Sequence, residues 1–203
     1  CSSLTQITIP SSITSIGEWA FSECSSLTQI TIPYSVTEIE NHTFMRCLLL
    51  AQISIPSSVI KIHNFAYSGC SSLTKITILF SVTSIGKGAF LKCSSLTQII
   101  IPSSITSIGE YAFSECSSLT QTTFEIPSSV TSIGDYTFNI EYEIPSSLKL
   151  IGEKCFTECK SLIKLLIPSS VTSYKLQSFN GFKTLAQITI PSSVTSIGWN
   201  AFY

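Results

Sequence analysis

The chain has 203 residues, a formal net charge of −1 and charged residues at only 11% of its positions. This near-neutral composition lacks the basic surface that binding to nucleic acids or anionic membranes requires, so neither is expected as a partner. The longest apolar runs, Leu48–Ala51 and Leu165–Ile167, are far shorter than the roughly 20 residues of a membrane-spanning helix, so we expect no membrane insertion.

One stretch, CSSLTQITIPSSITSIGEWAFSE at residues 1–23, recurs along the whole chain. Nine repeats can be counted on one landmark proline, for which Leu79 substitutes once: Pro10, Pro33, Pro56, Pro102, Pro127, Pro145, Pro168 and Pro191. A fixed period in the low twenties is typical of a solenoid, whose units bury their apolar faces against their neighbours. We therefore expect residues 1–203 to form a single solenoid domain. Because the chain begins and ends within a repeat, we also expect it to be a fragment of a longer protein.

Each repeat divides into three parts, whose positions are counted here from the proline (or Leu79). The alternating SLTQITIP stretch predicts a half-buried strand that the proline ends, because proline has no N–H for the ladder. The VTSIG stretch predicts a second short extended segment, and A-F-x-x-C, which is too short for a stable helix, predicts one helical or 3₁₀ turn. The expected fold class is thus mainly β: a solenoid of about nine coils with short parallel strands and 3₁₀ or helical turns.

The period breaks once, near residues 121–145. The interval from Pro102 to Pro127 is longer than the regular spacing of the prolines, whereas the interval from Pro127 to Pro145 is shorter. The strand alternation survives at Tyr142 and Ile144, so we expect the solenoid to continue with a local shift. A disordered or deleted loop is the alternative.

The repeat resembles the 23-residue leucine-rich repeat of the BspA-like (Treponema pallidum type) family, and the resemblance covers the whole chain. The residues that carry it in the first repeat are Leu4, Ile7, Ile9, Pro10, Ile13, Ile16, Ala20 and Phe21, followed by Cys24. Family members are surface adhesins and surface proteins. The resemblance therefore implies a leucine-rich-repeat solenoid at the cell surface or secreted, which adheres to host-matrix or other surface proteins. An intracellular, cytoplasmic scaffold or regulatory domain is the alternative.

The side chains that could take part in catalysis or metal binding are placed by the repeat. Six cysteines recur at one position of successive repeats: Cys1, Cys24, Cys47, Cys70, Cys93 and Cys116. A residue at the same place in every coil is a packing position, so we expect a ladder of buried free thiols in preference to disulfides or a zinc site. The two histidines, His42 and His63, are coils away from Asp135, so no Ser-His-Asp unit is expected. We expect no enzyme, no catalytic residue, no cofactor and no metal.

A protein ligand is the expected partner, and the outward positions of the first strand are the main candidates to bind it. These are Gln6, Gln29, Gln52, Lys75 and Gln98. They predict a flat, nearly uncharged, hydrogen-bonding platform on the concave side of the solenoid, where solenoids usually bind extended partners. A solvated face in which stacked polar side chains satisfy one another is the alternative.

Two further sets of residues are candidates for the same role. Trp19, Tyr111 and Tyr136 stand nine residues after the proline, where exposed aromatic side chains would anchor an interface and otherwise cover a corner of the coil. Glu125, Glu141 and Glu143 gather negative charge at the period break, which a basic partner or a cation would relieve, unless they only point to water. The open strand edges at both ends also predict end-to-end self-association.

Overall fold

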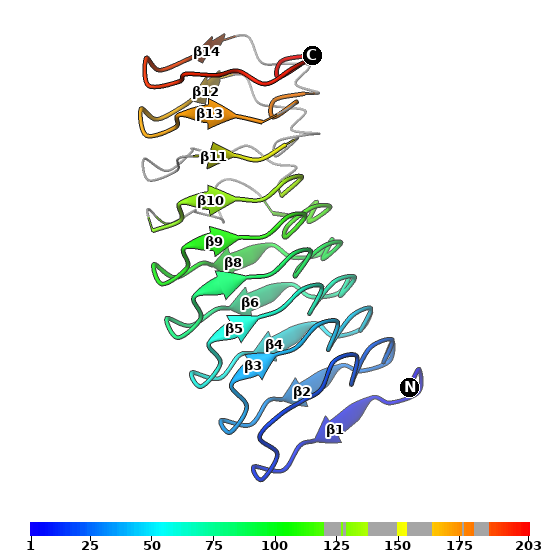
Figure 1. Ribbon diagram of the computed structural model, residues 1–203. Helices are drawn as coiled ribbons and strands as arrows, with labels where there is room; N and C mark the ends of the chain where they lie inside the picture. The colour runs from blue at the N-terminus through cyan, green and yellow to red at the C-terminus, as the bar shows by residue number, and fades with distance from the viewer. Residues whose placement is uncertain (120–126, 128, 138–149, 154–163, 176, 181–186) are drawn as a thin grey trace.

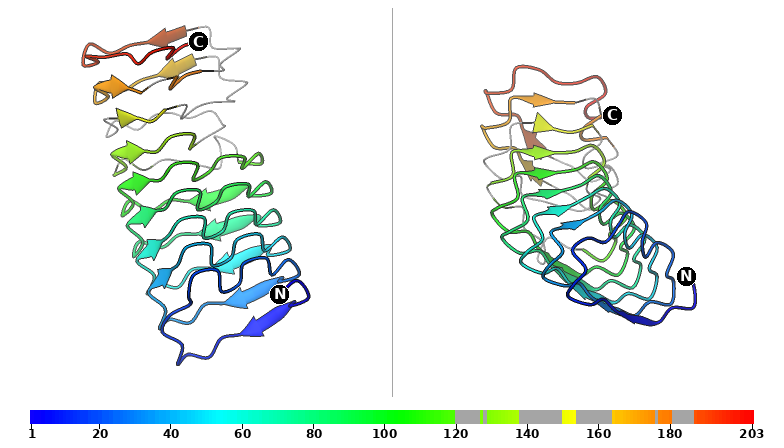
Figure 2. Two further views of the ribbon diagram at one scale, coloured as in Figure 1. Left: turned by 45° about the vertical axis from the view of Figure 1, so that its right-hand side comes forward. Right: turned by 60° about the horizontal axis from the view of Figure 1, so that its bottom comes forward.

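The computed structural model describes residues 1–119, 127, 129–137, 150–153, 164–175, 177–180 and 187–203. Successive coils of the chain lie on top of one another, from the N-terminus at one end of the stack to the C-terminus at the other (Figure 1; Figure 2). All strand pairings in the described residues are parallel, and most join equivalent residues of successive repeats, such as Gln6 and Gln29. The expected mainly β solenoid is confirmed.

The strands form two series, one from each extended segment of the coil. The first series consists of β1 (Gln6–Thr8), β2 (Gln29–Thr31), β4 (Gln52–Ser54), β6 (Lys75–Thr77), β8 (Gln98–Ile100), β12 (Lys164–Leu166) and β14 (Gln187–Thr189). The second consists of β3 (Glu38–Ile39), β5 (Lys61–Ile62), β7 (Ser84–Ile85), β9 (Ser107–Ile108), β10 (Ser132–Ile133), β11 (Leu150–Ile151) and β13 (Ser173–Tyr174). The second series is one seven-stranded sheet, whereas the first divides into the sheets β1-β2, β4-β6-β8 and β12-β14.

This continuous sheet has seven strands among the described residues, slightly fewer than the nine coils expected. The two terminal coils lack a second strand, and the last is joined to the sheet only by a bridge between Ser173 and Ser196. A terminal coil has a neighbour on one side only, so its short second segment gains half of the ladder contacts that inner coils have.

The core is built from columns of equivalent side chains. Eleven residues after the proline, Phe21, Phe44, Tyr67, Phe90 and Phe113 stack with ring centroids 5.3–5.5 Å apart. The last four of these side chains are fully buried. Stacked aromatic pairs contribute about 0.5–1.5 kcal/mol each beyond their burial, so this column stabilises every junction between these coils.

The segment that follows the second strand is a run of turns, so the expected helical or 3₁₀ turn is wrong for the described coils. Position +9 has a left-handed backbone with φ between 52° and 61° in Trp19, His42, Phe65, Gly88, Tyr111, Tyr136, Gln177 and Asn200. A right-handed helix does not admit such residues. Alternate N–H groups donate within the coil, as Ser22 does to Trp19 (2.9 Å), and to the next coil, as Phe21 does to the Thr43 carbonyl (2.9 Å).

The cysteine column also lies in the core. The five described inner members, Cys24, Cys47, Cys70, Cys93 and Cys116, are buried free thiols, as expected, and Cys1 is free and exposed. Each of the last four thiols donates to the carbonyl of the aromatic residue in the preceding coil, over 3.0–3.2 Å. Burial raises the pKa of Cys47 and Cys116 to about 12 and that of Cys70 and Cys93 well above its ordinary value.

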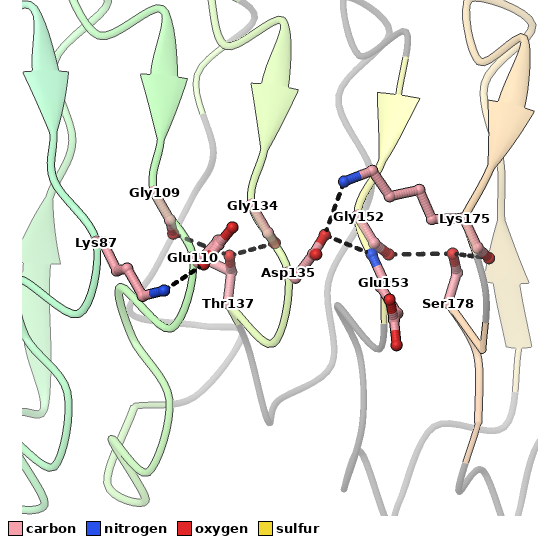
Figure 3. A network of polar contacts seen from close by, with 10 residues as sticks. All are labelled: Lys87, Gly109, Glu110, Gly134, Asp135, Thr137, Gly152, Glu153, Lys175 and Ser178. Carbon is pink, nitrogen blue, oxygen red and sulfur yellow. Dashed lines mark hydrogen bonds and ion pairs between the residues drawn. The ribbon is translucent and has the colours of Figure 1, made fainter.

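At the period break, the second-strand sheet continues without interruption. Ser132 pairs with Ser107 on one side and with Leu150 on the other, although both pairs depart from the regular repeat length. Polar contacts cross the same coils (Figure 3): Asp135 Oδ1 accepts from the Glu153 N–H (2.6 Å) and contacts Lys175 Nζ (3.2 Å). The changed repeat length is therefore taken up outside this sheet.

The buried thiols predict a loss of stability in alkali. The folded chain retains these protons above pH 9.0, the ordinary value at which an unfolded chain releases them. The free energy of unfolding is thus unaffected below pH 9.0 and falls as the pH rises toward about 12, by about 1.4 kcal/mol per pH unit for each thiol. Urea unfolding at a series of pH values measures this slope. The Cys93→Ala variant should show a shallower slope, and an equal slope would contradict the assignment.

Position +7 offers a matched pair of glycines. A Cβ on Gly86 would lie 2.6 Å from the His63 backbone carbon, whereas a Cβ on Gly17, in the first coil, would meet nothing within 4 Å. We expect Gly86→Ala to destabilise the fold by about 1–3 kcal/mol, since the coils must move apart, and Gly17→Ala to be neutral or slightly stabilising. Thermal unfolding of the two variants tests this, and equal melting temperatures would show that the coils separate freely here.

Candidate binding surface

The first-strand face, formed by the outward side chains of β1, β2, β4, β6 and β8, is the main candidate binding surface. Each of these strands has an exposed residue, a packed isoleucine and a second exposed residue. The five residues that the sequence places outward, Gln6, Gln29, Gln52, Lys75 and Gln98, are all exposed. Their outward orientation is as expected. Their role in binding, and the concave position of this face, stay predictions.

Within residues 1–119, a groove opens where the strand ladder is interrupted. β2 and β4 share no pairing, although β1 pairs with β2 and β4 with β6. The groove between them has a volume of about 440 Å³. Its lining residues are Thr28, Gln29, Ile30, Thr31, Ala51, Gln52, Ile53 and Ser54. Two of the predicted binding residues, Gln29 and Gln52, thus face each other across an opening that the sequence analysis did not anticipate.

The opening coincides with a change in the repeat, at the position before the outward glutamine. A threonine there donates its hydroxyl to the preceding coil's carbonyl, as Thr28 does to Thr5 (3.1 Å), Thr74 to Ala51 (3.2 Å) and Thr97 to Thr74 (3.1 Å). Ala51 occupies this position in the third coil and has no hydroxyl. The coil that begins with β4 therefore lacks the side-chain bond to the preceding coil that Thr28, Thr74 and Thr97 make.

A second, apolar hollow of about 310 Å³ continues from this groove, since both are lined by Thr31 and Ser54. Its remaining lining residues are Ile32, Tyr34, Ile55, Pro56, Thr77 and Leu79. Tyr34 is 77% exposed, and Phe80, at the same repeat position two coils later, is 74% exposed. The sequence analysis missed both residues. The available signal was that they replace the serine that follows the proline in the other coils.

The aromatic candidates lie on the turn segment and not on the strand face. Trp19 stacks on His42 with centroids 3.8 Å apart, and His42 on Phe65 at 5.1 Å. Tyr111 and Tyr136 form a separate stack at 4.7 Å. Because the rings lie on one another, each stack covers ring faces that a partner would otherwise contact.

The two stacks are separated by Gly88. A Cβ built there would lie 2.4 Å from the Phe65 ring, so Phe65 fills the place of the missing side chain. Trp19, at the end of the first stack, is 50% exposed. Burial lowers the pKa of His42 and outweighs the opposing effect of Glu18. The lower pKa favours the neutral imidazole within the stack.

The acidic candidates at the period break, Glu125, Glu141 and Glu143, lie outside the described residues. In the described part of the chain, one group of side chains is able to hold a metal ion, although none was expected: Glu38, Glu40 and His63. It lies along the second-strand sheet. The described terminal coils leave Ile13, Trp199 and Phe202 exposed, the apolar surface that the predicted end-to-end association would use.

Comparison with known proteins agrees with this architecture. The family model described as the BspA type leucine rich repeat region matches residues 1–120 and 118–203, in six copies. A leucine-rich repeat protein from Bacteroides ovatus is 35% identical to this chain, with a TM-score of 0.92. The match covers 100% of this chain and 53% of that protein. The pneumococcal vaccine antigen PcpA shares the fold at 21% identity and a TM-score of 0.63, over 94% of this chain and 61% of that one. No curated protein matches.

Stacked parallel coils with a fixed apolar pattern define a leucine-rich-repeat solenoid. The chain belongs to the BspA-type leucine-rich repeat family. It spans about half the length of the Bacteroides ovatus protein, so activities of a whole protein of this kind can only be proposed for it.

The missing hydroxyl at Ala51 generates a prediction. Ala51→Thr should restore the side-chain bond to the preceding coil, draw β4 toward β2 and raise the free energy of unfolding by about 0.5–1.5 kcal/mol. The reverse change, Thr97→Ala, should lower it by a similar amount. Chemical denaturation measures both values. Slower amide hydrogen exchange at Gln52 in the Ala51→Thr variant would show that the groove has closed, and unchanged exchange would contradict this account of it.

Proposed function

We propose that this chain is a non-catalytic protein-recognition module that binds an extended segment of a protein ligand along the first-strand face. The observation that carries the proposal is the row of exposed side chains formed by Gln29, Gln52 and Lys75. The groove lies between the first two of these residues. Polar side chains in register supply repeated hydrogen-bond donors and acceptors. The adjoining hollow at Ile32, Ile55 and Pro56 supplies an apolar pocket.

The chemistry of this face favours a protein ligand. Its exposed residues in β1, β2 and β4 are uncharged, so a highly charged polymer gains little from it. An extended peptide has both properties that the surface complements: backbone and side-chain polar groups at regular intervals, and apolar side chains that anchor in a pocket. Tyr34, which lines the hollow, and Phe80, which follows its lining residue Leu79, are both exposed and add aromatic area of the kind enriched at interfaces.

The candidate acid–base groups support a non-catalytic role. His42 lies in the aromatic stack, His63 Nε2 is 2.6 Å from a Glu38 carboxylate oxygen, and Asp135 contacts Lys175 and a backbone N–H. Each of these groups is thus committed to a different neighbour, and Asp135 lies several coils from both histidines. A nucleophile, base and orienting acid must instead meet within hydrogen-bond reach.

We further propose that the module belongs to a cell-surface or secreted adhesin that recognises host-matrix or other surface proteins. The support is the family resemblance of the repeat. No helix in the described part of the chain is long and apolar enough to cross a membrane. The buried thiols are compatible with an oxidising compartment, because their high pKa and burial protect them from disulfide exchange. Surface biotinylation of intact cells that express the parent protein tests the location, and recovery from cytosol alone would favour the intracellular scaffold.

The ligand and the surface can be tested together by pull-down against a panel of immobilised host-matrix proteins. For any protein that is captured, we expect Gln29→Ala combined with Gln52→Ala and Lys75→Ala to weaken binding at least roughly tenfold, since truncated central contacts dominate interface energy. Lys92→Ala is the matched control, because Lys92 is equally an exposed lysine but lies on the turn segment. Unchanged affinity in the triple variant would remove the first-strand face as the binding surface.

A further inference from the structure

We infer that Glu38, Glu40 and His63 form a binding site for a divalent transition-metal ion of the Zn²⁺ class. The site lies along the second-strand sheet, where β3 contributes Glu38 and the residues directly after β3 and β5 contribute Glu40 and His63. It is distinct from the first-strand face and does not depend on the proposed function.

Strand geometry brings the three side chains to one place. Glu38 and Glu40 flank the buried Ile39, so both point to the outer face of the sheet. β3 pairs with β5 in the register Ile39 to Ile62, which puts His63 beside Glu40 in the next coil. Although Glu38 and His63 belong to different repeats, the ring of His63 reaches back over one coil to the Glu38 carboxylate.

The distances suit a metal ion after small side-chain rotations. His63 Nε2 is 2.6 Å from Glu38 Oε2 and 4.0 Å from Glu40 Oε2, and one ligand atom from each residue lies within 4.8 Å of the others. A tetrahedral ion with bonds of about 2.0–2.2 Å holds its ligand atoms roughly 3.3–3.5 Å apart. Both measured separations therefore differ from the bound value by less than about 1 Å, with the backbone unmoved.

The repeat itself marks these positions as unusual. Position +7 is glycine in six coils: Gly17, Gly86, Gly109, Gly134, Gly152 and Gly198. The spacing of the coils favours this residue, since a Cβ on Gly86 would lie 2.6–2.8 Å from the backbone of His63 and Asn64. Glu40 and His63 occupy this crowded position in two consecutive coils, and Glu38 replaces the serine two residues earlier. Three departures from the repeat thus converge in space, and all three are residues with metal-ligand side chains.

Charge and donor type indicate the class of ion. Two carboxylates meet one imidazole, so the group has more negative charge than a protonated ring neutralises, and the side chains are only 19–37% exposed. A mixed nitrogen and oxygen donor set suits Zn²⁺ and its first-row neighbours, whereas Ca²⁺ and Mg²⁺ prefer oxygen ligands alone. Three protein ligands leave a fourth position open. Lys61, which pairs in register with Glu38, is the exposed positive charge that opposes the ion.

The experiment is a Zn²⁺ titration followed by the imidazole NMR signals of the only two histidines, in a Cys1→Ser background that removes the one exposed thiol among the described cysteines. We expect Zn²⁺ to shift the signals of His63 and to leave those of His42 in place. Glu40→Gly restores the residue of the other coils, so it keeps the fold. It should weaken binding at least roughly tenfold, because even the loss of a residue that only orients a metal ligand has an effect of that size.

Two further variants sharpen the test. His63→Ala should abolish the Zn²⁺-dependent rise in melting temperature, whereas His42→Ala should keep that rise even if it lowers the starting value. Lys61→Ser, which returns that position to the serine of other coils, should strengthen binding. Signals of His63 that do not respond to Zn²⁺, or wild-type affinity in Glu40→Gly, would overturn the site and leave His63 and Glu38 as an ion pair.

Discussion

The structure depends on one constraint: each residue of an inner coil lies directly on its equivalent in the next. Parallel strands at a spacing of about 4.8 Å leave no room for coils of different shape. Phe44, Tyr67 and Phe90 can form a column only because ring stacks on ring at the coil repeat. The cysteine column obeys the same rule, since the thiols of Cys70 and Cys93 each donate to a carbonyl of the preceding coil. Stability is therefore shared between neighbours, and no coil is independent.

The same constraint explains where this protein has freedom to vary. A buried position must fit two neighbours at once, whereas an outward position needs only to avoid them. The departures from the repeat accordingly gather on the surface: Tyr34 and Phe80 beside the proline corner, and Glu38, Glu40 and His63 along the second-strand sheet. Ala51 differs in kind, because it lines the groove and lacks the side-chain hydrogen bond that Thr28 and Thr74 make to the preceding coil.

Much of the architecture could be predicted because the repeat displays it nine times. Period-two alternation at Gln6–Thr8, the packing column at Phe44 and the free thiol of Cys70 each follow from a position that recurs. The turn segment could not be predicted, because the short A-F-x-x-C pattern does not distinguish a helical turn from other turns. Its left-handed φ at position +9 occurs where N–H groups donate to the next coil, as Trp19 does to the Asn41 carbonyl. Of the candidate binding residues, the structure describes the outward glutamines, Lys75, Trp19, Tyr111 and Tyr136. The groove beside Gln29 and Gln52 was missed.

The sequence by itself determined the stacking, the register and the identity of the buried columns, because these repeat with a period that is visible along the chain. Only the tertiary structure decided which of the residues that depart from the repeat lie next to one another. Glu38 and His63 belong to different repeats and have no relation in the sequence pattern, yet their side chains lie 2.6 Å apart. The physical reason is that one repeat makes one full turn of the solenoid and returns the chain to its starting point one strand spacing higher. Contacts across coils are therefore remote in sequence and adjacent in space.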